Sequence, residues 1–132
     1  MTILLVDDDV DDQVYFKDAV NELCDTLRCE IASNGLEALD RIDVPPPPDL
    51  IFLDLNMPVM SGFECLASLK KQERYKNIPV VIFTTSKNNQ DIDQARKMGA
   101  ELFFTKPTNF KILCSKLDKI LEMDFKSMQF IC

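Results

Sequence analysis

The sequence contains no histidine in 132 residues. This absence excludes Ser-His-Asp and Cys-His catalysis, histidine metal ligands and a role as a phosphohistidine carrier. The five cysteines are scattered and form no Cys-x-x-Cys pair, so neither a disulfide framework nor a thiolate metal site is indicated, and free, mostly buried thiols are expected. No apolar run approaches the roughly 18 residues of a membrane-spanning helix, and the segment Ile3–Val6 is too short for the core of a signal peptide. We therefore expect a cytoplasmic protein.

Positive charge is scarce relative to negative charge. The formal net charge is -7 and the pI is near 4.5, so the protein repels phosphate backbones and anionic lipids, and neither nucleic acid nor membrane is an expected partner. Hydrophobic residues make up 46% and charged residues 28% of the chain, as in ordinary globular proteins. No repeat, linker or shift in composition divides the chain. We expect one domain over residues 1–122, with residues 123–132 as an extension of the last helix or a tail.

The hydrophobic period switches between strand and helix five times along the chain. The expected strands are Ile3–Val6, Cys29–Ala32, Leu50–Leu53, IPVVIFTTS and ELFFT. The expected helices are the segment capped by Asp9 or Asp11, NGLEALDRI, Phe63–Arg74, DIDQARKMGA and the segment starting near Thr108 or Asn109. Such alternation requires βαβ crossovers and a parallel sheet covered on both faces. It predicts a doubly wound α/β fold of the flavodoxin-like type, (βα)5 with strand order 2-1-3-4-5.

Polar side chains follow four of these strands. Asp7 and Asp8 follow the first strand, Asp54 closes the third, Thr84 closes the fourth and Lys106 follows the fifth. Each residue alone is explained by a solvated turn or strand end, but ligands of such sheets bind at the carboxyl ends of the strands, where the strand order reverses. Carboxylates about 4 Å apart repel by roughly 4 kcal/mol per pair at an effective dielectric constant near 20, so three at one edge need a cation. Mg²⁺, with Mn²⁺ as the alternative, suits such oxygen ligands.

The motifs VDD at Val6–Asp8, DLNMPVMSG at Asp54–Gly62, the strand end at Thr84 and KP at Lys106–Pro107 together resemble the receiver domain of two-component response regulators, the CheY-like superfamily. The resemblance covers nearly the whole chain. It implies that Asp54 accepts a phosphoryl group from a histidine kinase, a phosphotransfer protein or a small acyl phosphate, and that the domain assists its own phosphorylation and dephosphorylation.

The resemblance also assigns roles to individual residues. It implies that Asp8 and Asp54 bind Mg²⁺ directly, Asp7 largely through water and Asn56 through its backbone carbonyl. It implies that Thr84 and Lys106 bind the phosphoryl oxygens. It further implies that Thr84 and Phe103 form the conformational switch, although plain core packing is an equal alternative for Phe103. The Lys106–Pro107 peptide bond is expected to be cis.

We expect no output domain after this chain's last helix. A phosphorylated receiver without such a domain must signal by contact with another protein. The expected surface is formed by the fourth helix, the fifth strand and the fifth helix, which would bind a protein target or a second copy of the chain. The last segment contains the apolar residues Phe125, Met128, Phe130 and Ile131. We expect it to pack against the body, with a partner or dimer contact as the alternative.

Three other functions compete with this one. A Mg²⁺-dependent phosphohydrolase with an aspartyl nucleophile needs a second aspartate two residues after Asp54, where Asn56 stands. A calcium loop is suggested by the alternation of Asp7, Asp9 and Asp11, but Asp12 replaces the glycine of its sixth position. A receiver-like module that binds partners without phosphorylation is the third, although every charged position of the site is present.

Overall fold

Five parallel strands form one sheet with the order β2-β1-β3-β4-β5 in the computed structural model, which describes residues 1–123. The strands are β1 (Thr2–Val6), β2 (Arg28–Ala32), β3 (Leu50–Leu53), β4 (Val80–Thr84) and β5 (Leu102–Thr105). The helices are α1 (Val10–Leu23), α2 (Gly35–Ile42), α3 (Gly62–Lys71), α4 (Asn89–Lys97) and α5 (Phe110–Leu121). The predicted doubly wound α/β fold and its strand order are confirmed.

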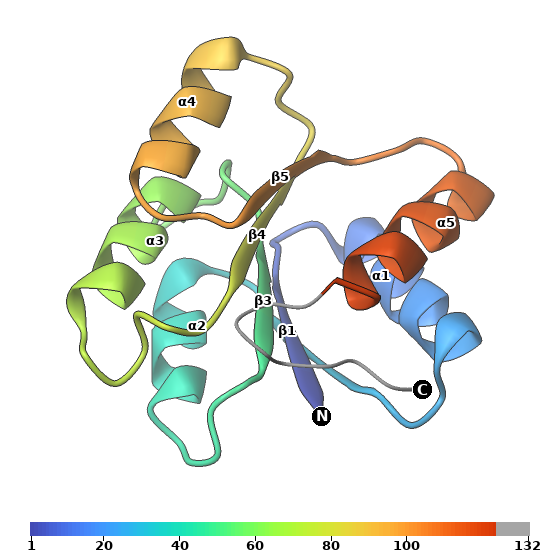
Figure 1. The fold of residues 1–132 in the computed structure, drawn as a ribbon, viewed down its shortest axis with the longest axis horizontal. Helices are drawn as coiled ribbons and strands as arrows, with labels where there is room; N and C mark the ends of the chain where they lie inside the picture. The colour runs from blue at the N-terminus through green and yellow to red at the C-terminus, as the bar shows by residue number, and fades with distance from the viewer. Residues whose placement is uncertain (124–132) are drawn as a thin grey trace.

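Helices cover both faces of the sheet, with α1 and α5 on one side and α2, α3 and α4 on the other (Figure 1). Alternate strand residues supply the two cores, because successive side chains of a strand point to opposite faces. Leu5 and Phe52 pack with Phe16 of α1, whereas Leu4 and Ile51 pack toward α2, α3 and α4. The strands β1, β3 and β4 are buried on both faces, which explains their continuous apolar sequences.

The register of the strands brings their carboxyl ends to one edge. Val6 pairs with Leu53 of β3 and with Ala32 of β2, and Thr84 pairs with Thr105 of β5. The chain leaves β1 toward β2 on one side and returns to β3 on the other, so the strand order reverses between β1 and β3. The residues directly after these two strands therefore lie at the switch point, the usual ligand position in this fold.

The first helix begins where the sequence predicts. Asp9 caps α1, and its side chain accepts a hydrogen bond from the backbone N–H of Asp12. The predicted end of the third helix at Arg74 is wrong, because α3 ends at Lys71 and Gln72 is already extended. The chain then turns so that Tyr75 is buried against the α2 side of the core, and this burial ends the helix early.

The cysteines follow the prediction only in part. Cys29, Cys65 and Cys114 are free thiols, as expected, and the first two are buried. Cys24 is disulfide-bonded, which the cysteine pattern did not indicate. The predicted contacts of Phe125, Met128, Phe130 and Ile131 lie outside the described residues.

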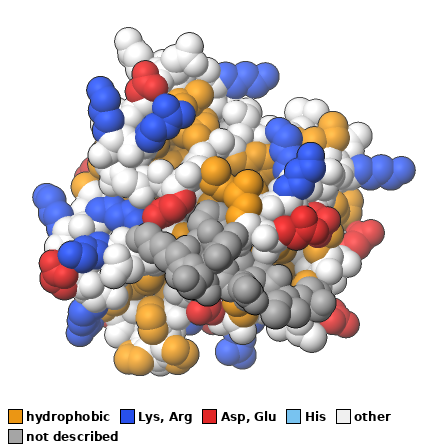
Figure 2. All heavy atoms as spheres, viewed as in Figure 1, with side chains coloured by type: hydrophobic (Ala, Val, Ile, Leu, Met, Phe, Trp, Pro, Cys, Tyr) orange, Lys and Arg blue, Asp and Glu red, His pale blue; other side chains and the backbone are white. Residues whose placement is uncertain are grey.

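One face of the molecule carries side chains of both signs of charge (Figure 2). On the face shown in Figure 2, acidic and basic side chains are interspersed, although the whole chain carries a net charge of -7. Within residues 1–123, no helix is long and apolar enough to cross a membrane.

Candidate functional site

Three aspartates converge at the switch point of the sheet. One carboxylate oxygen from each of Asp7, Asp8 and Asp54 lies within 4.8 Å of the other two. Asp7 and Asp54 are buried, and Asp8 is exposed. The sequence therefore predicted the convergence of these three residues correctly.

Backbone contacts fix the two buried aspartates. The N–H of Asp54 donates to the carbonyl of Val6 at 3.0 Å, and the N–H of Asp7 donates to the carbonyl of Ala32 at 3.0 Å, which extends the strand pairing by one residue. Gly62, the first residue of α3, lies against Asp54, because a Cβ built on it would be 2.2 Å from the Asp54 carbonyl oxygen. Only glycine permits this close approach.

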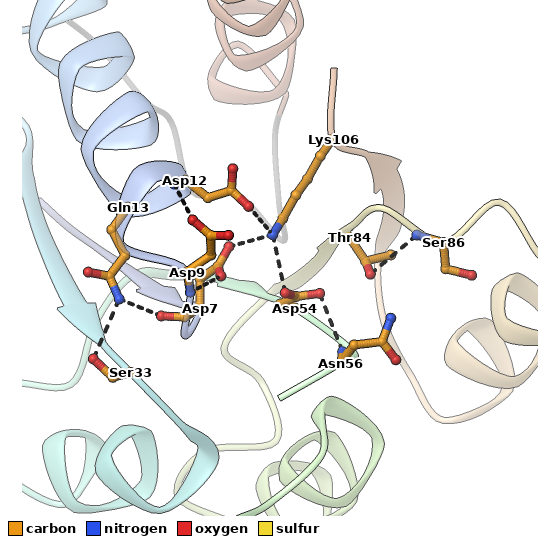
Figure 3. Close-up of polar contacts among 10 residues, drawn as sticks. All are labelled: Asp7, Asp9, Asp12, Gln13, Ser33, Asp54, Asn56, Thr84, Ser86 and Lys106. Carbon is orange, nitrogen blue, oxygen red and sulfur yellow. Dashed lines mark hydrogen bonds and ion pairs between the residues drawn. The ribbon is translucent and has the colours of Figure 1, made fainter. Parts of the chain in front are cut away.

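Lys106 connects the acidic residues (Figure 3). Its Nζ atom donates hydrogen bonds to Asp12 Oδ2 at 2.7 Å and to Asp54 Oδ2 at 3.2 Å. The same Nζ lies 2.7 Å from Asp7 Oδ2, an ion pair without hydrogen-bond geometry. The lysine side chain is only 8% exposed, so these contacts lie in a poorly solvated place where charge interactions are strong.

The pKa values of the buried pair reflect this environment. Burial raises the pKa of Asp7, and the contacts with Lys106 and with the N–H of Asp9 only partly offset that effect. Burial by itself lowers the pKa of Lys106, but the contacts with Asp12 and Asp7 and the charge of Asp54 outweigh it and raise this pKa. Lys106 is therefore a permanent positive charge next to Asp54.

The donor set fits a small hard cation. Mg²⁺ and Mn²⁺ prefer oxygen ligands, and the three converging aspartates offer only oxygens. The buried Oδ2 of Asp7 accepts no hydrogen bond from the described residues, so it has capacity for a metal ion or a metal-bound water. Asn56 lines the same cleft, and its N–H donates to Asp54 Oδ1 at 3.4 Å. This cleft has a volume of about 450 Å³ and is open to solvent.

Thr84 and Phe103 do not line the cleft around Asp54. Thr84 is fully buried, and its Oγ1 accepts a weak hydrogen bond from the N–H of Ser86 at 3.5 Å. The residue that lines the Asp54 cleft is its neighbour Thr85. Phe103 is half-buried and lines a separate cavity of about 310 Å³ between α4 and β5.

The prediction of a cis bond between Lys106 and Pro107 is wrong. The cis proline bond of the described chain is Pro45–Pro46, and the Lys106–Pro107 bond is trans. The trans bond still lets the Lys106 amine point inward, because Lys106 contacts Asp7, Asp12 and Asp54.

Asp12 is a site residue that the sequence did not reveal. It lies in the first turn of α1, lines the cleft around Asp54 and contacts Lys106. The one sequence signal for Asp12 is its spacing of three residues from the cap Asp9, because residues three apart at the start of a helix lie on the same side of it.

A doubly wound sheet with three aspartates and a lysine at its switch point defines an α/β domain whose acidic cluster fits a divalent cation. The sequence profile of the response regulator receiver domain matches residues 3–118, and the chain belongs to this family. Its members are the CheY-like switches of two-component signalling rather than metabolic enzymes.

Known proteins of the family resemble the chain over most of its length. It is 28% identical to the chemotaxis protein CheY1 of Helicobacter pylori over 123 residues, 92% of this chain and 97% of that protein. The phosphorylated cyanobacterial phytochrome response regulator RcpA matches with a TM-score of 0.87 and 29% identity, over 97% of this chain and 96% of RcpA. The Mn²⁺-bound form of response regulator Rcp1 matches with a TM-score of 0.81 and 30% identity, over 99% of each chain.

Proposed function

We propose that the protein is a phosphorylation switch that accepts a phosphoryl group on Asp54 from a histidine kinase or a phosphotransfer protein and signals by protein contact. The observation that carries the proposal is the convergence of Asp7, Asp8 and Lys106 on Asp54 at the edge of the sheet. The proposal also includes two expectations from the sequence, a domain boundary near residue 122 and a cytoplasmic location.

Asp54 is the proposed nucleophile because, of the two buried aspartates, it is the one that lines the cleft. One of its oxygens forms a bond to phosphorus while the bond from phosphorus to the donor nitrogen or oxygen breaks and the donor keeps the electron pair. The transition state is loose, so positioning and charge neutralisation contribute most of the rate.

The neighbouring residues have the complementary roles. Asp8, Asp54 and the backbone carbonyl of Asn56 would hold Mg²⁺ directly and Asp7 would hold it through water, with Mn²⁺ as a substitute. When bound there, the ion would neutralise part of the charge on the phosphoryl oxygens. Lys106 supplies a second positive charge beside Asp54 Oδ2. The same arrangement assists hydrolysis of the aspartyl phosphate, because the stabilised transition states are similar.

Thr84 and Phe103 form the proposed switch. Thr84 closes β4 beside the Asp54 strand, and its hydroxyl would turn from Ser86 toward the new phosphoryl oxygens. Phe103 lies over α4 on the adjacent strand, where the ring would move further inward. The changed surface of α4, β5 and α5 would then bind a protein target or a second copy of the chain.

Phosphoryl transfer from a small acyl phosphate with Mg²⁺ tests the proposal. We expect labelling of the parent chain, loss of labelling in Asp54→Asn and loss of labelling in the parent when the metal is chelated. Equal labelling of the parent and Asp54→Asn would refute the assignment. Steady turnover of a phosphomonoester would instead favour a phosphohydrolase.

The signalling step has its own test. Sedimentation of the protein with and without beryllofluoride and Mg²⁺, combined with partner capture in both states, should show a phosphorylation-dependent assembly. If beryllofluoride changes neither the sedimentation nor the partner capture, the proposed signalling by protein contact is contradicted.

A further inference from the structure

Asp12, in the first turn of α1, contacts Lys106 of the site. Its Oδ2 accepts a hydrogen bond from Lys106 Nζ at 2.7 Å, closer than the 3.2 Å between that nitrogen and Asp54 Oδ2 (Figure 3). The Asp12 side chain is 36% exposed, whereas the side chains of Lys106 and Asp54 are each 8% exposed. Asp12 is therefore the solvent-facing partner of a buried lysine.

The lysine ammonium contacts three carboxylates before any phosphoryl group arrives. It donates hydrogen bonds to Asp12 and Asp54 and forms an ion pair with Asp7. A phosphoryl oxygen that binds Lys106 must compete with these contacts. Releasing Asp7 would leave a fully buried carboxylate without its only cationic partner among the described residues, which is costly. Releasing Asp12 exposes its carboxylate to water, which replaces the lost hydrogen bond at little cost.

Asp12 also adds a negative charge to the entrance of the site. It lines the Asp54 cleft on one side and a neighbouring cavity of about 370 Å³ with Tyr15 and Phe110 on the other. An incoming phosphodonor is anionic, so this carboxylate repels the donor while it occupies the lysine that the donor needs.

We propose that Asp12 is a positioning residue that holds Lys106 in the unphosphorylated protein and exchanges it with the incoming phosphoryl group, and that it thereby slows phosphorylation of Asp54. The inference rests on the proposed function of Asp54 as phosphoacceptor. It adds a regulator of rate that acts through Lys106 and touches neither the phosphorus nor the metal.

Asp11 offers a matched control. Asp11 and Asp12 are adjacent in the first turn of α1 and both line the Asp54 cleft, but Asp11 forms none of the described ion pairs of Lys106. The substitutions Asp12→Asn and Asp11→Asn remove the same charge from the same helix end. A difference between them measures the contact with Lys106.

The experiment follows the rate of phosphorylation by a small acyl phosphate at saturating Mg²⁺. We expect Asp12→Asn to react about threefold to tenfold faster than the parent, a change of roughly 0.7–1.4 kcal/mol in barrier. Asp11→Asn should change the rate by less than about twofold. Asp12→Glu, which restores a carboxylate within reach of Lys106, should return the rate to near the parent value.

The inference is overturned if Asp12→Asn matches Asp11→Asn, or if Asp12→Asn is slower than the parent. It is also overturned if Asp12→Glu reacts as fast as Asp12→Asn, because the carboxylate would then not be what restrains Lys106. Asp54→Asn serves as the reference for the function itself. Labelling that persists in Asp54→Asn refutes the phosphoacceptor, whereas labelling that depends on Asp54 but not on Asp12 refutes only this inference.

Discussion

Asp7 is the residue whose ionisation is costly to the folded protein. Its carboxylate is fully buried, and burial raises its pKa more than Lys106 and the Asp9 N–H lower it. An acid with a raised pKa binds its proton more tightly in the folded state than in the unfolded state. Ionised Asp7 therefore destabilises the fold above that raised pKa, and the cost disappears as the pH falls below the unfolded value of about 3.9.

The substitution Asp7→Asn should stabilise the protein when no divalent cation is present. The amide keeps the shape of the side chain without the buried charge, so we expect the melting temperature to rise by about 2–5 °C near neutral pH. The gain should shrink as the pH falls through the raised pKa of Asp7, and it should vanish below the unfolded value of about 3.9. Thermal unfolding followed by circular dichroism in chelator, with the exposed Asp11→Asn as control, checks this. A lower melting temperature near neutral pH would contradict it.

A side chain at Gly62 should destabilise the fold, because α3 can approach Asp54 this closely only where residue 62 has no Cβ. A Cβ on Gly62 would meet the Asp54 and Leu55 backbone, which cannot move aside. A Cβ on Gly35 would meet only the flexible side chain of Met60 at 2.8 Å. We expect Gly62→Ala to cost about 1–3 kcal/mol of unfolding free energy and Gly35→Ala clearly less, measured by urea denaturation. Equal costs would argue against the close approach.

Residue identity alone was enough to place the acidic centre but not its surroundings. Asp7, Asp8, Asp54 and Lys106 follow strands directly, and parallel strands bring such positions to a common edge whatever the details of packing. Asp12 belongs to a helix, and its direction depends on where the Asp9 cap starts that helix. Its contact with Lys106 therefore could not be predicted without coordinates.

At the scale of elements, Ser86 ties the end of β4 to the start of α4. Its Oγ donates to Asp91 Oδ2 at 2.7 Å and accepts from the N–H of Asn88 at 3.2 Å, while its own N–H contacts Thr84 Oγ1. The loop between β4 and α4 is thus held at both ends by a single serine. A movement of Thr84 would reach the first turn of α4 through these contacts.

Removal of this hydroxyl in Ser86→Ala should loosen the start of α4 and leave the rest of the fold intact. Losing about 1 kcal/mol of local hydrogen bonding corresponds to roughly fivefold faster amide exchange for residues 88–92. Hydrogen exchange measured by mass spectrometry would show it. Ser115→Ala, at an exposed position of α5, is the control and should leave exchange in α4 unchanged. Unaltered exchange in Ser86→Ala would mean that the loop is held by other contacts.

The existence and type of each helix and strand in residues 1–123 could be predicted, but some of their ends could not. Continuous apolar runs such as Leu50–Leu53 permit little besides a buried strand between helices. The third helix fits a helical pattern to Arg74, yet it stops at Lys71 because the burial of Tyr75 outweighs local propensity. Boundaries set by tertiary packing are not visible in local periodicity.

At the scale of the whole molecule, two electrostatic effects oppose folding without a cation. The chain carries a net charge of -7, so its charges repel one another through solvent, and the cluster of Asp7, Asp8 and Asp54 adds repulsion at short range. Any salt screens the first effect. Lys106 relieves part of the second effect through its contacts with Asp7 and Asp54, and an ion that binds among the three carboxylates relieves more of it.

Mg²⁺ should therefore raise the melting temperature beyond the effect of sodium chloride at equal ionic strength. Binding to the folded state alone at about 100 times the dissociation constant contributes about 2.7 kcal/mol, which corresponds to a rise of at least about 5 °C. Asp8→Asn removes one proposed ligand from an exposed position, so it should lose most of the specific rise while keeping the response to sodium chloride. Equal Mg²⁺ responses in the parent and Asp8→Asn would contradict the assignment of Asp8 as a ligand, and a Mg²⁺ response no larger than that to sodium chloride would show that the ion acts only by screening the net charge.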